Sequence, residues 1–289
     1  DCQRAPARLI GDPMPLEFHK MHGAGNDFVL VDARGKTFEV SPERAARIAD
    51  RRRGIGCDQI LVLRHSDDDS CVLRYEIWNT DGSRAAQCGN GARCIALYME
   101  LNGEETDRPF NVESPSGRVT MSRQADGEYE IDMGIPRFEP GAVPLELEPE
   151  DGLYRIDSPW GRLEFGAASM GNPHALLVCE TIDTADIPEI GAYLGAHDAF
   201  PDGVNVGFCQ VLGPSSIRLR VIERGAGETP ACGSGACAAA AILQRLGLVG
   251  ERVDVTLPGG HLVIKWRGNN KTLTMKGPAQ HVFRGIMNE

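Results

Sequence analysis

The chain contains one long internal repeat, and this feature most restricts how it can fold. The segment 88–92 (CGNGA) recurs as 232–236 (CGSGA), 144 residues later. Asn79 lies nine residues before the first cysteine, and Glu223 lies nine residues before the second. Several matches in the same order at a nearly constant offset predict two similar lobes that arose by duplication. The other matched pairs are Leu16–Phe18 with Leu163–Phe165, Gly25–Val31 with Gly171–Leu177, and Met133-Gly134 with Lys276-Gly277.

The boundary between the two lobes is expected in the segment 133–152, where four prolines interrupt an acidic stretch. We expect residues 14–132 to form the first lobe and residues 133–277 to form the second. Residues 278–289 are expected to return to the first lobe. Residues 1–13, which precede Met14, are interpreted as an N-terminal extension that is peripheral to function.

Most segments between turns are short and rich in β-formers, which predicts strands. A helix is predicted from Pro42 to about Arg53, with Ser41 as its N-cap and Gly54 as its stop. The run 51–53 (RRR) is interpreted as solvated cations that the helix C-terminus favours. The expected strands are 28–32, 59–64, 72–78, 119–122 and 129–133 in the first lobe, and 162–165, 175–179, 204–212, 217–223, 253–257, 261–266 and 272–275 in the second.

Two further helices are expected directly after the cysteine motifs. Segments 92–99 and 236–243 are apolar nearly all round, which is typical of buried helices rather than amphipathic ones. A helix that is apolar on all sides must be covered by other elements, and the predicted strands can form a sheet around it. The predicted fold is therefore α+β, with two similar lobes. Each lobe is a curved, mainly antiparallel β-sheet or barrel wrapped around a central buried helix, and the active site is expected in the cleft between the lobes.

The position of the repeated cysteines suggests acid–base chemistry. The first amides of a helix lack internal partners and, with the helix dipole, favour an anion such as a carboxylate. A cysteine at such a helix start is expected to have a lowered thiol pKa. Two such cysteines related by a pseudo-twofold axis would face one substrate carbon from opposite sides. Cys88 and Cys232 are therefore predicted to act as base and acid in inverting a stereocentre.

Purely structural roles for the cysteines are also open. A single glycine-rich cysteine motif is more often a tight turn with a buried thiol, and only the duplication favours catalysis. A disulfide between the two repeated cysteines would be an inactive, oxidised form. Six of the seven remaining cysteines are interpreted as packing residues, with Cys2 of the N-terminal extension left aside: Cys57, Cys71, Cys94, Cys179, Cys209 and Cys237.

Composition excludes several classes of function. The net charge of −11 argues against nucleic-acid binding and against a basic membrane surface. Nine cysteines, with no secretion signal and no Cys-x-x-Cys pair, suggest free thiols in the cytoplasm and no zinc ribbon. The glycine-rich runs lack the dinucleotide-binding fingerprint, and no P-loop or recognisable pyridoxal-phosphate lysine is present. No cofactor and no metal are therefore expected.

Several long and specific motifs lie along residues 16–285. They are 21–28 (MHGAGNDF), 56–59 (GCDQ), 79–83 (NTDGS), 88–92 (CGNGA), 171–174 (GNPH), 223–229 (ERGAGET) and 231–235 (ACGSG). Arg93 and Cys94 extend the first cysteine motif, and Asn205-Val206 is a further short match. Through these motifs the chain resembles the diaminopimelate epimerase family.

The resemblance implies interconversion of LL- and meso-diaminopimelate without cofactor, in the synthesis of lysine and peptidoglycan precursors. It implies that Cys88 and Cys232 are the acid–base pair, that His174 and Glu223 lie beside the thiols, and that the protein is a homodimer. The substrate-binding residues that it implies, with backbone amides of the glycines among them, are Asn26, Gln59, Asn79, Gly89, Asn90, Asn172, Asn205, Glu223, Arg224, Gly233 and Ser234.

The chemistry of these residue types agrees with a substrate that has two ammonium–carboxylate centres. Amides can donate to a carboxylate and accept from an ammonium. Arg224 can bind a distal carboxylate with two hydrogen bonds, and Glu223 can pair an ammonium. Two alternatives stay open at this stage. One is a proline racemase or hydroxyproline epimerase, and the other is a non-catalytic protein that binds an amino acid between its lobes.

Overall fold

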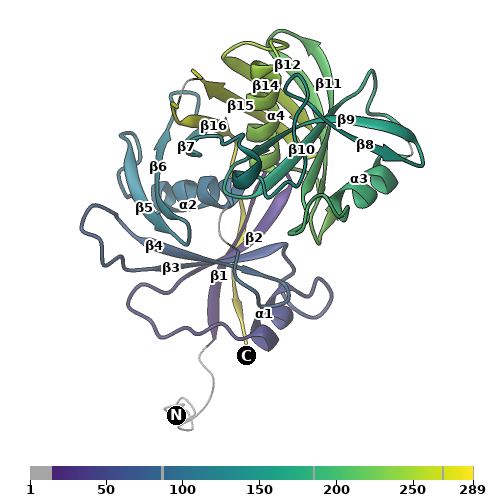
Figure 1. The fold of residues 1–289 in the computed structure, drawn as a ribbon. Helices are drawn as coiled ribbons and strands as arrows, with labels where there is room; N and C mark the ends of the chain where they lie inside the picture. The colour runs from purple at the N-terminus through teal and green to yellow at the C-terminus, as the bar shows by residue number, and fades with distance from the viewer. Residues whose placement is uncertain (1–14, 86–87, 185, 269, 289) are drawn as a thin grey trace, which may run out of the picture.

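The computed structural model describes residues 15–85, 88–184, 186–268 and 270–288. The proposed extension (residues 1–13) lies outside the described residues. Figure 1 shows the chain as two lobes, one built mainly from the N-terminal half and the other from the C-terminal half. Within the described ranges, no helix is long and apolar enough to cross a membrane.

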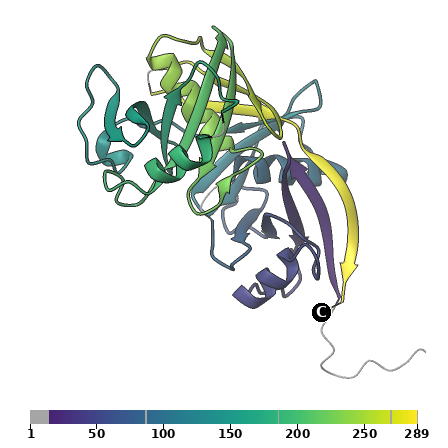
Figure 2. The same ribbon diagram turned by 90° about the vertical axis from the view of Figure 1, so that its right-hand side faces the viewer.

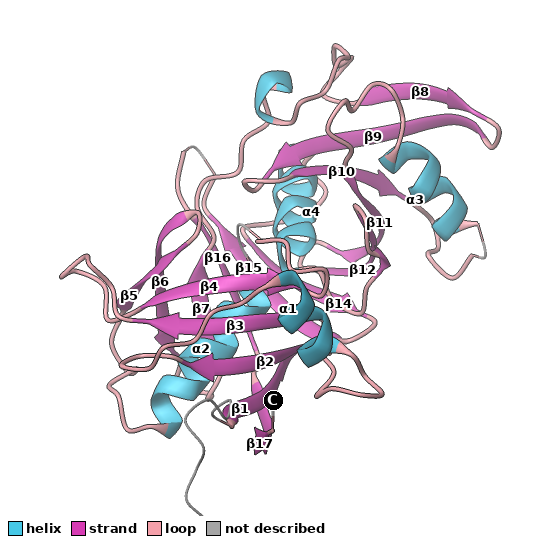
Figure 3. Cartoon of the chain, turned by 90° about the horizontal axis from the view of Figure 1, so that it is seen from below, coloured by secondary structure: helices cyan, strands magenta, loops and turns pink. Residues whose placement is uncertain are grey.

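The first lobe is a curved sheet with one helix inside it and one outside. The inner helix α2 packs against β1, β6, β7 and β17, whereas α1 lies outside against β3 (Figure 3). The elements of this lobe are β1 (Leu16–Gly23), β2 (Asn26–Asp32), α1 (Pro42–Ala49), β3 (Gln59–Arg64), β4 (Arg74–Asn79), α2 (Gly89–Leu101), β5 (Phe110–Ser114), β6 (Gly117–Arg123), β7 (Tyr129–Asp132) and β17 (Gln280–Met287).

The second lobe repeats this arrangement. Its inner helix α4 packs against β9, β10, β11 and β15, and α3 lies outside against β11 and β12. Its elements are η1 (Pro140–Ala142), β8 (Tyr154–Ser158), β9 (Gly161–Ser169), β10 (Pro173–Val178), α3 (Ile187–Gly195), β11 (Asn205–Gly213), β12 (Ser216–Glu223), β13 (Gly227–Glu228), α4 (Gly233–Arg245), β14 (Arg252–Leu257), β15 (Gly260–Trp266) and β16 (Leu273–Gly277).

The strand pairings repeat along with the sequence. In the first lobe β2 pairs with β3 in parallel, with Phe28 opposite Gln59, and β3 pairs antiparallel with β4. In the second lobe β10 and β11 pair in parallel, with His174 opposite Asn205, and β11 pairs antiparallel with β12. The duplication predicted from the sequence is therefore a duplication of topology, and the predicted fold class is confirmed.

Apolar burial explains why each sheet closes around its helix. In α4 the alanines from Ala236 to Ala241, together with Ile242 and Leu243, are at most 4% exposed. In α2, Ile95 and Ala96 are fully buried. Cys94 and Cys237 are also fully buried and belong to the core around these helices, as expected for packing thiols.

The strands of the two lobes join in one continuous sheet. Strand β16 of the second lobe pairs antiparallel with β7 of the first. Strand β17 then returns beside β1, with Leu16 opposite Met287 and His22 opposite Gln280, as Figure 2 shows for the yellow and purple strands. The lobe limits at residues 133 and 278 stay a prediction, because no break in the sheet marks them.

The predicted helix 42–53 is too long. Ser41 is its N-cap, and its hydroxyl accepts from the Arg44 N–H at 3.2 Å, but α1 ends at Ala49. The Asp50 carboxylate accepts hydrogen bonds from the backbone N–H groups of Arg52 and Arg53, which favours a turn over another helical residue. Elements without a sequence prediction include α3, β5, β8 and β17.

Close contact between two turns brings the lobes together beside the second cysteine motif. The turn between β1 and β2 holds Ala24, and the turn between β14 and β15 holds Gly259. The backbone N–H of Gly259 donates to the Pro230 carbonyl at 2.7 Å. A Cβ atom on Gly259 would lie 2.1 Å from the Ala24 carbonyl oxygen and 2.9 Å from Pro230 Cβ. This contact therefore requires glycine.

We expect Gly259→Ala to destabilise the fold by roughly 1–3 kcal/mol, because the new methyl group must displace backbone of the other lobe. Chemical denaturation would measure the change in the free energy of unfolding. Gly213→Ala is the matched control, since nothing lies within 4 Å of a Cβ at that position. Equal stability of the two variants would show that the turn contact is unimportant.

Candidate active site

A cleft of about 1020 Å³ lies where the two lobes meet. It contains twelve of the fourteen residues that the sequence analysis predicted for the site. His174 and Asn205 are buried behind it and are not among its lining residues. The predicted residues that line the cleft are Asn26, Gln59, Asn79, Cys88, Gly89, Asn90, Asn172, Glu223, Arg224, Cys232, Gly233 and Ser234.

Both repeated cysteines are the N-cap residues of the inner helices. Cys88 precedes α2 and Cys232 precedes α4, each in an extended backbone conformation. The carbonyl of each accepts the first helical hydrogen bond, from Ala92 and Ala236, both at 3.0 Å. The thiols therefore lie beside the helix amides that have no partner within the helix.

The two helix starts converge on one methionine of β16. A Cβ on Gly89 would lie 2.3 Å from Met275 Cε, and a Cβ on Gly233 would lie 3.1 Å from Met275 Sδ. Asn90 of α2 also links the two cysteine motifs directly. Its Nδ2 donates to the carbonyl of Ala231, the residue before Cys232, at 3.1 Å. Because the glycines after the cysteines have no side chains, both helix N-termini can pack against Met275 and face the same cleft.

Burial raises the pKa of both thiols, and the expectation of lowered values is wrong. For Cys88 burial, with a smaller contribution from the Glu223 charge, raises the pKa to about 11, while the backbone N–H of Gly91 and the charge of Arg93 oppose the increase. For Cys232 burial and then the Glu223 carboxylate raise the pKa well above its usual value. Loss of water around the thiolate outweighs the helix N-terminus in this structure.

Glu223 contacts one cysteine only. The Cys232 thiol donates to Glu223 Oε2 at 3.1 Å, and the Thr229 hydroxyl donates to the other carboxylate oxygen. The residue at the equivalent strand end in the first lobe is Asn79, which accepts from the Gln59 amide at 2.9 Å. The site is therefore symmetric in its backbone but not in its charge.

His174 reaches the thiol through a serine. Its Nε2 lies 3.1 Å from both Asn172 Oδ1 and Ser234 Oγ, and Ser234 Oγ lies 3.6 Å from Cys232 Sγ. Burial, with a smaller contribution from Arg224, lowers the pKa of His174 to about 3. The imidazole is therefore neutral at physiological pH and orders the polar groups beside Cys232.

Asn205 supports the site from behind. Its Nδ2 donates to the Pro173 carbonyl at 2.9 Å, and its Oδ1 accepts from the Arg224 backbone N–H at 3.0 Å. These bonds join β10, β11 and the segment after β12. Arg224 is exposed at the rim of the cleft, and its guanidinium donates to the Asp202 carbonyl.

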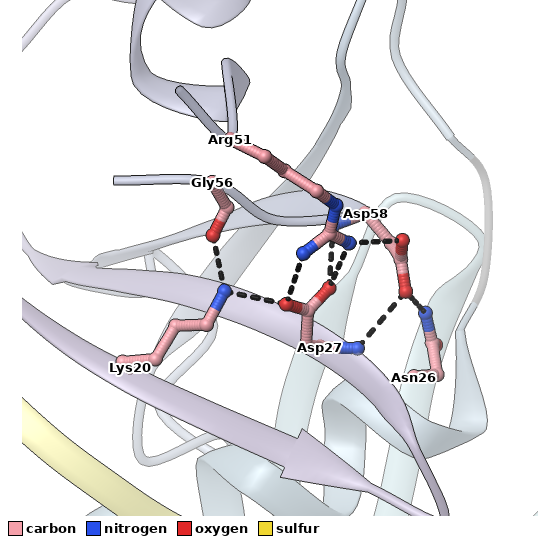
Figure 4. Close-up of polar contacts among 6 residues, drawn as sticks. All are labelled: Lys20, Asn26, Asp27, Arg51, Gly56 and Asp58. Atoms are coloured by element: carbon pink, nitrogen blue, oxygen red, sulfur yellow. Dashed lines mark hydrogen bonds and ion pairs between the residues drawn. The ribbon is translucent and has the colours of Figure 1, made fainter. Parts of the chain in front are cut away.

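A group of charged residues holds Asn26 in place at the opposite side of the cleft (Figure 4). Asn26 Nδ2 donates to Asp58 Oδ2 at 2.9 Å, and Arg51 donates to both Asp58 and Asp27 at 2.8 Å. Lys20 pairs with Asp27 from the other side at 2.5 Å. Arg51, interpreted from the sequence as a solvated cation, is 57% exposed, but two carboxylates also bind it.

The Asn26 carbonyl oxygen consequently points toward Cys88. Its Oδ1 lies 3.7 Å from Cys88 Sγ and 3.3 Å from Asn90 Nδ2. Other lining residues were not predicted from sequence to belong to the site. They include Asp50, Arg51, Cys57, Asp58, Thr80, Asp81, Met133, Glu228 and Thr229, together with small residues of α1 and of the loop before Cys232. Several of them lie inside the family motifs 56–59, 79–83 and 223–229, and that position was the signal in the sequence that could have indicated them.

No group of three or more His, Cys, Asp or Glu side chains within the described ranges is arranged to hold a metal ion. The expectation of no cofactor and no metal stays a prediction.

Solved structures of several isomerases share this fold. A hydroxyproline epimerase from Agrobacterium vitis superposes with a TM-score of 0.70 at 17% identity, covering 94% of this chain and 92% of that one. A predicted epimerase from Pseudomonas aeruginosa superposes with a TM-score of 0.64 at 18% identity, covering 93% and 98%. At these identities the likeness concerns the fold alone.

Sequence comparison identifies the family. The family model described as diaminopimelate epimerase matches residues 18–139 and 166–282. A diaminopimelate epimerase from Xanthomonas euvesicatoria pv. vesicatoria is 47% identical over 274 residues, 94% of this chain and 96% of the relative. One from Xanthomonas campestris pv. campestris is 46% identical over 275 residues, 95% and 97% of the two chains. The chain belongs to the diaminopimelate epimerase family.

We expect Glu223→Gln to lower the pKa of Cys232, because the negative charge that raises it is removed while an acceptor for the thiol remains. The pH dependence of iodoacetamide alkylation at Cys232, followed by peptide mass spectrometry, should move toward lower pH. Glu228→Gln is the matched control, since Glu228 lines the same cleft but pairs with Arg220. An unmoved alkylation curve in Glu223→Gln would contradict this assignment.

Proposed function

We propose that this chain interconverts LL- and meso-diaminopimelate, with Cys88 and Cys232 as the two proton-transfer groups. The observation that supports the proposal is the convergence of two cysteine N-caps on one cleft, in a chain that matches the family over most of its length. The chain is accordingly an isomerase. Lysine and peptidoglycan-precursor synthesis is the metabolic setting that follows from this reaction.

The reaction requires one thiolate and one thiol. The thiolate of one cysteine takes the proton from the α-carbon, and the electron pair of that C–H bond stays on the carbon as a carbanion. The thiol of the other cysteine then gives its proton to the opposite face of the same carbon. The configuration is inverted, and the cysteines have exchanged protonation states. The reverse direction uses the same groups with their roles exchanged.

The carbanion requires more than proton transfer. The α-carboxylate of the substrate would lie against the free amides of Gly89, Asn90, Gly233 and Ser234, where two helix N-termini stabilise the charge that develops on it. Because the cleft is polar but partly enclosed, this electrostatic stabilisation is stronger than it would be in water. Burial, which raises the pKa of the thiols, also makes each thiolate a stronger base once it forms.

Charged residues of the cleft suit a substrate with two zwitterionic ends. Glu223 lies at Cys232 and would pair with the ammonium on the carbon that is inverted. Arg224, at the rim, would bind the distal carboxylate. Asn26, Gln59, Asn79 and Asn172 present amides to the remaining polar groups. Proline has no second charged end for Arg224 to bind, which favours diaminopimelate over proline or hydroxyproline.

Three further statements belong to the proposal. The reaction needs no cofactor and no metal, because the helix amides supply the stabilisation of charge. The protein works in the cytoplasm, where its many free thiols stay reduced. It works as a homodimer, as the family resemblance implies.

The test is incubation of the reduced protein with LL-diaminopimelate in D₂O without added cofactor, followed by proton NMR. We expect loss of the α-proton signal together with appearance of the meso isomer. Exchange on proline or hydroxyproline instead would support the alternative isomerases. Binding of diaminopimelate without any exchange would support the non-catalytic alternative and contradict the proposal.

We expect Cys88→Ser and Cys232→Ser each to lower kcat by roughly 10²–10⁴, because each removes one of two required proton-transfer groups. The NMR exchange assay measures the loss. Cys179→Ser is the matched control, since Cys179 is half-buried and does not line the cleft. Full activity in either cleft variant would show that its cysteine does not transfer a proton.

A further inference from the structure

The side-chain amide of Asn26 can face the cleft with either of its two ends. Its carbonyl oxygen accepts hydrogen bonds and its NH2 group donates them, so a flip of the amide would reverse the polarity that meets Cys88. In the structure Asn26 Oδ1 lies 3.7 Å from Cys88 Sγ, and Asn26 Nδ2 donates to Asp58 Oδ2 at 2.9 Å. The polarity of this corner of the cleft therefore depends on the partner of Asn26 Nδ2.

The Asp58 carboxylate can bind only one end of this amide. A carboxylate accepts hydrogen bonds and donates none, and its bond to an NH2 group is charge-assisted. A flipped amide would place Asn26 Oδ1 against Asp58 Oδ2, and Asn26 Nδ2 against Asn90 Nδ2, so that both contacts would be repulsive. The contact with Asn90 is the longer one, at 3.3 Å, and Asn90 Nδ2 also donates to the Ala231 carbonyl. Asp58 is therefore the stronger constraint on the amide.

Asp58 is itself held by three hydrogen bonds besides the one from Asn26. Its Oδ2 also accepts from the backbone N–H of Asp27 at 3.0 Å, and its Oδ1 accepts from Arg51 Nη2 at 2.8 Å (Figure 4). Its own backbone N–H donates to Asp27 Oδ1 at 2.9 Å. Because both carboxylate oxygens have partners, the carboxylate cannot turn away from Asn26 without breaking these bonds.

The second lobe forms the same strand junction without these carboxylates. Strands β2 and β3 of the first lobe correspond in register to β10 and β11 of the second. The residues at the positions of Asp27 and Asp58 are there Pro173 and Val204, both apolar and buried. The topology therefore does not require carboxylates at this junction, and their presence beside Asn26 calls for a role in the site.

Ion pairing alone does not account for the arrangement. The side chain of Arg51 is 57% exposed and that of Asp58 is 39% exposed. An ion pair with such exposure contributes little to the free energy of unfolding. Asn26, by contrast, lines the cleft together with Cys88. The contact through which Asp58 bears on the site is therefore its bond with Asn26.

We propose that Asp58 is a positioning residue of this site. It orients the Asn26 amide so that the carbonyl oxygen, and not the NH2 group, faces Cys88 and the bound substrate. This corner of the cleft then accepts a hydrogen bond from a thiol or from a substrate ammonium, and it disfavours a carboxylate. The proposal rests on the proposed function and adds to it a residue that acts through Asn26.

The first experiment needs no turnover. Protein labelled with ¹⁵N at asparagine alone gives side-chain amide signals in a ¹H–¹⁵N spectrum, and the pair that disappears in Asn26→Ala belongs to Asn26. In the wild-type protein we expect one Asn26 Nδ2 proton at unusually low field, because it donates to a carboxylate. In Asp58→Ala that proton should return to the range of the other asparagines. An Asn26 pair with ordinary shifts in the wild-type protein would overturn the proposal.

The second experiment is a double-mutant cycle in the exchange assay. Asn26→Ala and Asp58→Ala should each lower kcat/KM about ten-fold or more, as expected for the loss of a hydrogen bond to a charged group. Because Asp58 acts through Asn26, the double variant should be no worse than Asn26→Ala alone. Losses that multiply would show that Asp58 has an independent role and would overturn the proposal.

Asp68→Ala is the matched control. Asp68 also accepts from an arginine, Arg118, and from a backbone N–H, that of Ser70, but it lies outside the cleft. Its removal should leave the Asn26 signals and kcat/KM unchanged. Should Asp58→Ala not fold, the wild-type shift of the Asn26 amide still decides the proposal. No exchange on diaminopimelate by the wild-type protein would reject the proposed function, whereas the amide spectra would still decide this inference.

Discussion

The site depends on one packing contact, the convergence of two buried helices on Met275. Gly89 and Gly233 both press against this side chain, and a β-carbon at either position would collide with it or crowd it. Asn90 ties the start of one helix to the backbone before the other. Because the free amides of a helix lie at its first turn, this single junction brings two anion-stabilising groups and two cysteines to one cleft.

Duplication gave the two lobes the same backbone arrangement around the site, but the charges of the side chains beside the two cysteines differ. Both lobes end a strand nine residues before a cysteine, yet one ends in Asn79 and the other in Glu223. Inversion of a stereocentre needs an acid and a base that differ at any moment and can exchange roles. A symmetric backbone with a small difference in charge meets both needs. His174 and Ser234 add neutral polar contacts on the Cys232 side without adding a charge.

Sequence was sufficient for the fold class and for most strands, which follow from local patterns. It was also sufficient for twelve of the cleft residues, most of which follow from the family resemblance rather than from the repeat. It failed where a residue's environment comes from distant segments. The end of α1 depends on the Asp50 side chain, and Arg51 is bound by Asp27 and Asp58. Asn205 and His174 belong to the right motifs, but the strand register places both behind the cleft, where backbone and serine contacts occupy them.

By itself the sequence determined that there are two lobes, that each contains a buried helix, and that a cysteine begins each helix. Hydrophobic periodicity and glycine spacing are properties of neighbouring residues, so they can be recognised along the chain. Only the tertiary structure decided the ionisation of the site. The pKa of a thiol depends on the balance between lost hydration and nearby charge, and both come from the other segments that enclose it. Burial outweighs the helix amides at Cys88 and Cys232, and the Glu223 carboxylate contacts only the Cys232 thiol.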